Sequence, residues 1–427
     1  MTMSTGVDSS PPSSRKISPW LMLPPVIEDG GEMVYKFYNL SEEKEESFLR
    51  NSGKEMADDA AAKFVGSSHG WLALFNERNN NHLFLYNPIT RRYIKLPPIE
   101  TLPDPMINLT HDGRGIISKL ILSSSPDDDD ECIAMMTFGP GDRLAICQPC
   151  RSTEWTPIGE SFFECGYENV LVVHGGLIYG RAYEDFVYCN RLKRFICLMQ
   201  LEFDLVHGYL CYELEDWDLN DPHSPASVPR NCDKWNYFRY QGGDEWINQN
   251  LRLLEKCRQI PYLILADSQL FIVHRFIMDR VAHDGSYVHV GEIPYDPISR
   301  RLLVDAYPHK TFGFSVLKVV YIDHEDGRRD VKVSLVKDSD SLDGLTMFVG
   351  MSHSFAVSSS DFPNLKPNSI YFTDANKHDN SMYGGHDIGI FDFANKTLSD
   401  CYCYPGVDVP SFKRIVPPPM WFTPSLY

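Results

Sequence analysis

Three histidines, each beside a glycine or a serine, are the residues of this sequence best suited to chemistry. His69 stands in Gly-Ser-Ser-His-Gly (66–70), His353 in Gly-Met-Ser-His-Ser (350–354), and His386 directly precedes Asp387. Because imidazole has an unperturbed pKa close to neutral, histidines that converge in the central channel of a repetitive fold can transfer protons or bind a metal ion. The alternative, which we favour, is that each histidine bonds to backbone in a turn and stabilises its own repeat.

Cys147-Gln-Pro-Cys150 has the spacing of a dithiol redox centre. Such a centre requires a helix that begins at the first cysteine, because the helix dipole lowers the pKa of the thiol. The residues on either side indicate a strand, a turn and a second strand instead. No second Cys-x-x-Cys is present, so a four-coordinate zinc site is also hard to build. We therefore predict a structural turn here.

Residues 127–131 are five consecutive acids. A calcium loop needs carboxylates that are spaced along the chain and folded inward around a glycine, and five adjacent acids cannot all face one ion. A solvated hairpin tip is the favoured interpretation. From these motifs together we predict no catalytic residue, no cofactor and no metal ion.

Composition narrows the class of protein. The chain has 427 residues, 43% of them hydrophobic, a formal net charge of -18 and eleven cysteines without regular spacing. Clustered Lys and Arg are sparse, which makes nucleic acid an unlikely partner. No stretch approaches the roughly eighteen apolar residues of a membrane helix, so we expect no membrane insertion. The scattered odd cysteines and the lack of an apolar leader predict free thiols inside a cell.

The elements that must position these residues are short β-strands in a repeated order. Residues 66–98 contain three apolar runs separated by turn formers, and the same order recurs over 169–198 and 347–398. A single meander of this kind cannot bury both of its faces, so the copies must pack against one another. We predict an all-β fold, a β-propeller of about six (roughly five to seven) four-stranded antiparallel blades. Further strands are expected at positions that include 287–293 and 301–307.

Both ends of the chain carry a short apolar segment bounded by proline, around Trp20 and around Trp421. We predict that these segments pair in one blade and close the ring with both tryptophans buried, because closure removes an exposed sheet edge. Residues 1–17 are expected to be a disordered leader and 18–427 the propeller. A helical insertion is predicted around 213–256, within an inserted segment 213–257. The Glu-rich stretch 41–46 is predicted to be a charged connector, and a short helix capped by Ser41 is the alternative.

Several motifs resemble the plant KIB-type β-propeller family, formerly a domain of unknown function. They are Val65-Gly-Ser-Ser-His-Gly-Trp-Leu, Leu85-Tyr-Asn-Pro-Ile-Thr-Arg-Arg, Phe348-Val-Gly-Met-Ser-His-Ser-Phe-Ala-Val, His386-Asp-Ile-Gly-Ile-Phe-Asp and Pro417-Pro-Pro-Met-Trp-Phe-Thr-Pro. Many members of that family carry an N-terminal F-box, a helical adaptor that docks on a ubiquitin-ligase scaffold. Here the residues that follow Trp20 break any helix, so the sequence resembles the F-box-less members, which are often associated with mitochondria or other organelles.

The repeat pattern, the missing catalytic set and the resemblance together indicate a non-catalytic protein-interaction scaffold, not an enzyme, that binds one or more unknown protein partners. We also expect a monomer. Two alternatives stay open. One is a substrate receptor of an SCF-type ubiquitin ligase that acts through a separate adaptor. The other is a hydrolase that uses the central channel, with His386 and Asp387 as its working pair. The expected location is intracellular, in a mitochondrion or another organelle, with cytoplasm or nucleus as the alternative.

Overall fold

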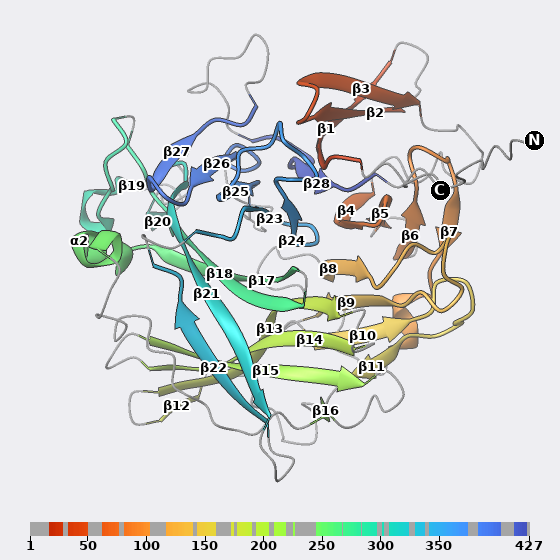
Figure 1. The fold of residues 1–427 in the computed structure, drawn as a ribbon, viewed down its shortest axis with the longest axis horizontal. Coiled ribbons are helices and arrows are strands. Elements are labelled where there is room, and N and C mark those ends of the chain that lie inside the picture. The colour runs from red at the N-terminus through yellow and green to blue at the C-terminus, as the bar shows by residue number, and fades with distance from the viewer. Residues whose placement is uncertain are drawn as a thin grey trace, which may run out of the picture.

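The structure is a computed structural model, and the chain is described over the following residues: 17–28, 33–49, 62–76, 81–102, 117–139, 143–158, 172–174, 177–189, 194–204, 209–218, 225–226, 245–266, 268–282, 284–296, 301–302, 307–323, 329–337, 341–374, 383–402 and 414–424. Within these ranges the chain is almost entirely β-strand (Figure 1). The predicted leader 1–17 lies outside the described residues except for Ile17.

Six sheets of four or five strands hold nearly all of the described strands. Sheet 1 consists of β28 (Met420–Phe422), β1 (Trp20–Ile27), β2 (Met33–Asn39) and β3 (Lys44–Leu49). Sheet 2 consists of β4 (Lys63–Ser68), β5 (Trp71–Asn76), β6 (His82–Tyr86) and β7 (Tyr93–Lys95). Sheet 3 consists of β8 (Ile117–Leu122), β9 (Ala134–Phe138), β10 (Arg143–Cys147) and β11 (Thr156–Ile158).

The second half of the chain supplies the other three. Sheet 4 consists of β12 (Val172–His174), β13 (Leu177–Cys189), β14 (Arg194–Asp204), β15 (Tyr209–Asp218) and β16 (Pro225–Ala226). Sheet 5 consists of β17 (Arg258–Ala266), β18 (Gln269–Met278), β21 (Lys310–Asp323) and β22 (Arg329–Leu335). Sheet 6 consists of β24 (Phe355–Ser358), β23 (Leu345–Val349), β25 (Ser369–Phe372), β26 (Gly389–Asp392) and β27 (Thr397–Ser399).

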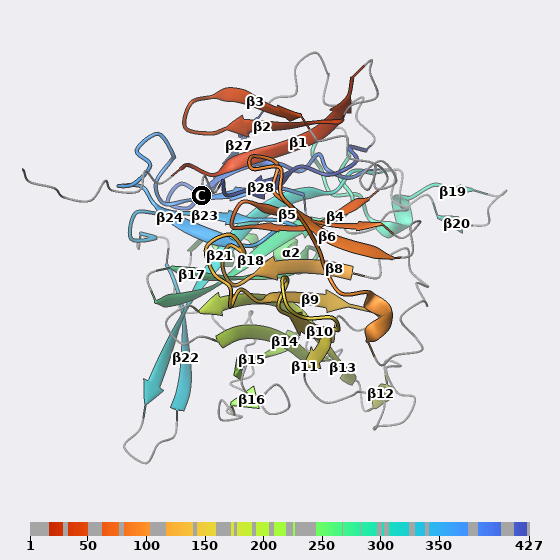
Figure 2. The same ribbon diagram turned by 90° about the vertical axis from the view of Figure 1, so that its right-hand side faces the viewer.

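The sheets form a β-propeller, as predicted. Sheets 1 to 5 are wholly antiparallel, whereas sheet 6 contains one parallel pair, β23 with β25. Figures 1 and 2 both place β1, β2 and β3 of sheet 1 at the top of the molecule and sheet 4 towards the bottom, where β22 of sheet 5 also extends. The number of sheets lies within the predicted range of five to seven.

Each sheet buries both of its faces, because the side chains of a strand alternate between two neighbouring sheets. All six residues of β5 are buried. Leu72 and Leu74 pack against sheet 1, while Trp71, Ala73 and Phe75 pack against sheet 3. Such a strand shows a continuous apolar run in the sequence rather than an alternating pattern.

The same arrangement repeats around the ring. Separate apolar clusters join sheet 1 to 2, 2 to 3, 3 to 4, 4 to 5, 5 to 6 and 6 back to 1. Every sheet therefore has two neighbours, and the six clusters form a closed cycle.

The two ends of the chain close the ring, as predicted. β28 pairs antiparallel with β1, which places Trp20 opposite Phe422 and Leu21 opposite Trp421. Both tryptophans are buried. Trp421 packs on the sheet 6 side, where its ring contacts Phe348 edge-on and its Nε1 donates a hydrogen bond of 2.9 Å to the carbonyl of Val349.

Helix α2 (Glu245–Leu254) is the one α-helix of the described chain. It packs Ile247 and Leu254 against Phe276 of sheet 5, and these two residues mark its buried face. No helix in the described ranges is long and apolar enough to cross a membrane.

The helical insertion predicted around 213–256 contains α2, and β15 extends into the start of this range as a paired strand to Asp218. Two other sequence expectations are wrong in detail. The predicted strand 287–293 is an isolated bridge at Tyr287 followed by the 3-10 turn η4 (Val290–Glu292). In the Glu-rich stretch 41–46, residues 41–43 form a turn and Lys44 begins the edge strand β3. This strand tolerates charge because its side chains alternate between two faces and several face solvent. The alternative of a short helix at this stretch is also wrong. Most of the predicted strand 301–307 lies outside the described residues, which retain β20 (Arg301–Leu302) paired with β19 (Tyr295–Asp296).

We predict that Trp421→Ala lowers the free energy of unfolding by about 3–5 kcal/mol, because it opens a cavity between sheets 6 and 1 at the closing pair. Urea unfolding followed by tryptophan fluorescence and circular dichroism measures this change. Tyr295→Ala serves as the control, since Tyr295 is 59% exposed, and should change stability by no more than about 0.5 kcal/mol. Equal effects of the two substitutions would contradict a structural role for the closing pair.

Candidate functional site

The structure brings His69 and His353 together. His69 occupies the turn between β4 and β5 with a φ of 51°, and His353 follows β23. Their rings stack with centroids 6.1 Å apart, and the backbone N–H of His353 donates to the carbonyl of Ser67 at 3.3 Å. Sheets 2 and 6 are separated by sheet 1 in the ring, so this contact lies where the innermost strands of the sheets converge.

A buried ion pair lies close to the two histidines. Lys119 of β8 binds Asp185 of β13 through its Nζ, and both side chains are almost fully buried. The second carboxylate oxygen of Asp185 accepts a hydrogen bond of 2.7 Å from the backbone N–H of Leu263 in β17. This one carboxylate therefore connects sheets 3, 4 and 5 and fixes their relative positions.

The protonation states of the paired histidines follow from this enclosure. Burial, with smaller contributions from the nearby His69 and the positive charge of Lys119, lowers the pKa of His353 to about 3. Burial also lowers the pKa of His69, and this effect outweighs a hydrogen bond with the backbone of Leu122 that raises it. Both rings are neutral at physiological pH, which suits a structural role better than proton transfer.

The segment around His69 also matches the pattern Gly-x-Ser-x-Gly over residues 66–70. A nucleophile elbow with this pattern joins a strand to a helix and exposes its serine. Here Ser68 lies at the end of β4, the chain turns into β5, and Ser68 is 2% exposed. Its Oγ accepts a hydrogen bond of 2.9 Å from the N–H of Leu122. The serine therefore joins sheets 2 and 3 and does not present a nucleophile.

His386 and Asp387 lie in a second polar cluster between sheets 5 and 6. Both residues belong to the connection from β25 to β26. This connection meets the one from β18 to β21 at one end of sheet 5, the end opposite the β17–β18 turn. The sequence prediction grouped all three histidines, whereas the structure joins His386 to residues that the prediction did not include.

Asp387 is fully engaged with Arg275, whose side chain is completely buried. Arg275 Nη2 lies 2.8 Å from Asp387 Oδ2, and the same oxygen accepts from the N–H and the Oγ1 of Thr311 at 2.9 and 2.7 Å. The guanidinium also donates to the carbonyl of Thr373 and lies 4.7 Å from the ring centroid of Phe372. Burial opposes the charged form of Arg275, but the charge of Asp387 outweighs it and the pKa of the guanidinium is raised.

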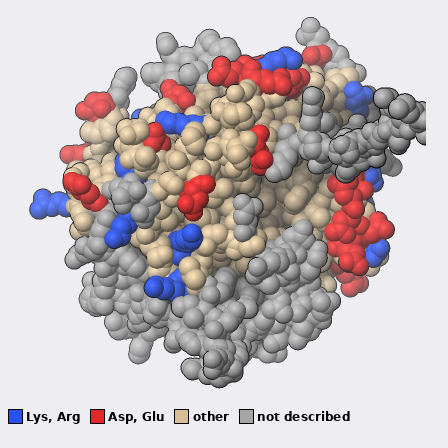
Figure 3. Space-filling model, in the orientation of Figure 1, with Lys and Arg blue, Asp and Glu red and all other residues tan. Residues whose placement is uncertain are grey.

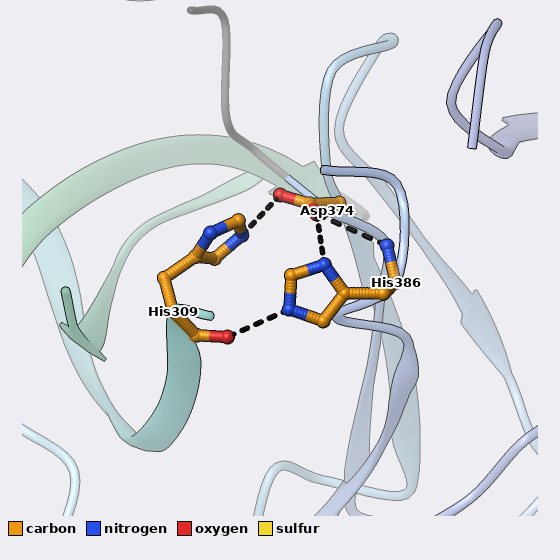
Figure 4. Close-up of side chains that lie close together, drawn as sticks. All are labelled: His309, Asp374 and His386. Atoms are coloured by element: carbon orange, nitrogen blue, oxygen red, sulfur yellow. Dashed lines mark hydrogen bonds and ion pairs between the residues drawn. The ribbon is translucent and has the colours of Figure 1, made fainter. Parts of the chain in front are cut away.

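His386 contacts Asp374 and His309 instead of its sequence neighbour (Figure 4). Asp374 Oδ1 lies 2.8 Å from His309 Nε2, and Asp374 Oδ2 lies 3.7 Å from His386 Nδ1. The backbone N–H of His386 donates to Asp374 Oδ2 at 3.2 Å, and His386 Nε2 lies 2.9 Å from the carbonyl of His309. Two imidazoles and one carboxylate therefore face one another, with donor atoms suited to a metal ion.

The pKa of His309 is set by opposing effects of burial and of nearby negative charge. Burial disfavours its charged form, but the hydrogen bond to Asp374 and the negative charges of Asp374 and Asp387 outweigh burial, so the pKa of His309 is raised. Sequence inspection missed His309, Asp374 and Arg275. Asp374 directly follows the Ser-Ile-Tyr-Phe-Thr strand motif and His309 directly precedes a strand, so both positions mark strand ends, but nothing in the sequence indicates that the two ends meet.

The two other motifs behave as predicted. Cys147 ends β10, a turn follows, and the N–H of Gln148 donates to Ser152 Oγ, so no helix begins at this cysteine. Burial raises the pKa of the Cys147 thiol, the opposite of what redox chemistry needs. Residues 127–131 form the turn between β8 and β9, in which Asp130 is 92% exposed.

The sequence matches the KIB1-4 beta-propeller family over residues 37–392. No curated protein matches it. Among solved structures, puromycin hydrolase is similar with a TM-score of 0.30 and 10% identity, covering 81% of this chain and 47% of that protein, so the chain spans about half of its length. The α-L-arabinofuranosidase Arb93A from Fusarium graminearum has a TM-score of 0.27 and 8% identity, covering 78% of this chain and 76% of that one. An endo-1,5-α-L-arabinanase from Thermotoga petrophila has a TM-score of 0.24 and 8% identity, covering 90% and 96%. Similarities this low carry no argument about function.

We predict that the free energy of unfolding falls as the pH is lowered below about 6.5, the pKa of an unperturbed histidine. Burial lowers the pKa of folded His274 to about 4 and that of His353 to about 3, so between these values and 6.5 the unfolded chain binds protons that the folded chain does not. His353→Gln should reduce the slope of unfolding free energy against pH, measured by urea unfolding from pH 7 to pH 4. An unchanged slope would contradict burial of a neutral His353, and exposed His289→Ala is the control.

We predict that Arg275→Met lowers the free energy of unfolding by about 3–5 kcal/mol, because it leaves the Asp387 carboxylate buried without its cation. The double variant Arg275→Met/Asp387→Leu should lose less than the sum of the two single variants, and a double-mutant cycle of urea unfolding measures this coupling. Arg258→Met is the matched control, since the pair of Arg258 with Asp279 is partly exposed and should contribute at most about 1 kcal/mol. Additive losses would show that Arg275 and Asp387 act independently.

Proposed function

The chain belongs to the KIB1-4 beta-propeller family, and we propose that it acts as a non-catalytic scaffold that binds a partner protein at exposed turns of the ring. The observation that carries this proposal is the acidic turn, residues 127–131, between β8 and β9. Asp128, Asp130 and Glu131 are exposed there. Figure 3 shows acidic side chains gathered at the right-hand edge of the view, in the region of the loops around β7 and β11.

The acidic turn is held in one conformation by its own hydrogen bonds. The N–H groups of Asp128 and Asp129 both donate to the carbonyl of Ser125 at 3.1 Å. Asp129 accepts from Ser124 Oγ at 2.9 Å and from the N–H of Glu131 at 2.8 Å. Because little further ordering is needed on binding, the exposed carboxylates are presented to a partner at low entropic cost.

Charge indicates the kind of partner. The chain carries a net charge of -18, and at the acidic turn Arg92 pairs with Asp127 while Arg151 lies 3.7 Å from Asp130, which leaves Asp128 and Glu131 to face solvent. A surface of this sign attracts a positively charged segment and raises its rate of association. We therefore infer a partner protein that presents a lysine- or arginine-rich segment.

The contacts of His386 and Asp387 support a scaffold over the hydrolase alternative. That alternative requires the two neighbouring side chains to work on one substrate as an acid and a base. Asp387 is bound to Arg275 and Thr311, whereas His386 faces Asp374 and His309. The two side chains therefore have separate partners and do not form a catalytic pair.

We predict that the triple variant Asp128→Asn/Asp130→Asn/Glu131→Gln recovers at least tenfold less partner protein in affinity capture from cell extract. The reason is that it removes three exposed charges without removing the hydrogen bonds of Asp129. Thermal unfolding should be unchanged. Recovered proteins are compared by mass spectrometry with those of the wild type at low and high salt, since exposed charge pairs are screened by salt.

Glu42→Gln/Glu43→Gln is the matched control, because it neutralises another exposed acidic turn, between β2 and β3. Capture of the same partners by the triple variant would contradict the acidic turn as the binding surface. Absence of any reproducible partner for the wild type would contradict the scaffold itself.

A further inference from the structure

We propose that His309, Asp374 and His386 form a site for one divalent transition-metal ion of the zinc class, which joins the connections of sheets 5 and 6. This inference does not depend on the proposed function. It also differs from the sequence prediction of no metal, which considered His386 together with His69, His353 and Asp387 but did not include His309 or Asp374. The three residues come from connections separated by more than sixty residues in the chain.

The donor atoms have the composition and the separation of a metal site. One atom from each residue, two imidazole nitrogens and a carboxylate oxygen, lies within 4.8 Å of the other two. Two histidines with one carboxylate are a ligand set that zinc and similar ions favour, with a further position open to water. Hard ions such as calcium and magnesium prefer all-oxygen sites, so the two imidazoles favour a transition metal.

The tautomer of His386 directs a lone pair into the cluster. Its Nε2 lies 2.9 Å from the carbonyl of His309, and because a carbonyl can only accept, Nε2 carries the proton. In the neutral ring Nδ1 is then an acceptor. This Nδ1 is buried without a hydrogen-bond partner and lies 3.7 Å from the acceptor oxygen Asp374 Oδ2. Two acceptors that face each other in a buried place are stabilised by a cation between them.

Surrounding groups hold the ligands as outer-shell contacts do in metal sites. A metal-binding histidine commonly donates its other ring N–H to a carbonyl, which fixes the ring and its tautomer, and His386 does so to His309. The backbone N–H of His386 also orients the carboxylate of Asp374. The next residue, Asp387, is fixed by buried Arg275, so the connection that carries His386 has little freedom to move.

Binding requires one proton to leave. Without a metal, His309 Nε2 and Asp374 Oδ1 share a proton in their 2.8 Å contact. The ion takes the place of this proton, which passes to solvent; His309 keeps a proton on Nδ1 and so binds as a neutral imidazole, Asp374 stays a carboxylate, and His386 keeps its Nε2 proton. No bond is oxidised or reduced.

The test uses the full chain after removal of metal with a chelator. Zn²⁺ binding is measured by calorimetry and by bound metal per chain after dialysis, and Co²⁺ is used as a spectroscopic probe. We expect one Zn²⁺ per chain and a Co²⁺ spectrum with d–d bands but no thiolate charge-transfer band, since the chain also holds eleven cysteines. Asp374→Asn and His386→Ala should each weaken Zn²⁺ binding at least tenfold.

His289→Ala is the control, because it removes an exposed histidine outside the cluster and should leave binding unchanged. Circular dichroism of each variant confirms folding, and the nearly isosteric Asp374→Asn decides the result if His386→Ala does not fold. Absence of stoichiometric binding to the wild type, a thiolate band in the Co²⁺ spectrum, or unchanged affinity in Asp374→Asn would each overturn the proposal. None of these outcomes bears on capture of a protein partner.

Discussion

Burial of both faces of every sheet is the constraint on which the rest of this structure depends. A strand such as β5 sends alternate side chains to sheets 1 and 3, so neither face is complete until both neighbours are in place. Six apolar clusters, one between each pair of adjacent sheets, then require a closed cycle. Stability is shared around the ring, because loss of one interface exposes apolar surface on two sheets.

Polar groups near the middle of the ring set positions that apolar packing alone does not specify. The carboxylate of Asp185 binds Lys119 and the backbone of Leu263, so it fixes three consecutive sheets relative to one another. Close backbone approach adds a second constraint, since a Cβ at Gly66 would lie 1.9 Å from the carbonyl oxygen of Leu120 in the neighbouring sheet. Only glycine fits there, which gives a physical reason for the Gly-Ser-Ser-His-Gly motif.

The sequence predicted those features that depend on local pattern. Dense apolar runs between turn formers located most strands, and the repeated order of strands indicated a propeller closed by its ends. Of the three histidines whose convergence was the less favoured interpretation, His69 and His353 lie in contact, whereas His386 lies in another cluster. The contact of Arg275 with Asp387 could not be predicted, because the two residues are 112 positions apart and their proximity depends on which sheets are neighbours. The contact of His309 with Asp374 could not be predicted for the same reason, because it too depends on which sheets are neighbours. The parallel pairing of β23 with β25 has no sequence pattern that distinguishes it from an antiparallel one.

Pairing of β28 with β1 has a consequence for biosynthesis. A ribosome releases the chain from its N-terminus, so sheets 2 to 6 can form in order while sheet 1 waits for its innermost strand. Until Met420–Phe422 leaves the exit tunnel, Leu21 and the apolar face of sheet 6 stay open to water and to other nascent chains. Completion of the fold therefore waits for the last strand of the ring, and the ring that still lacks β28 is the state that chaperones would have to protect.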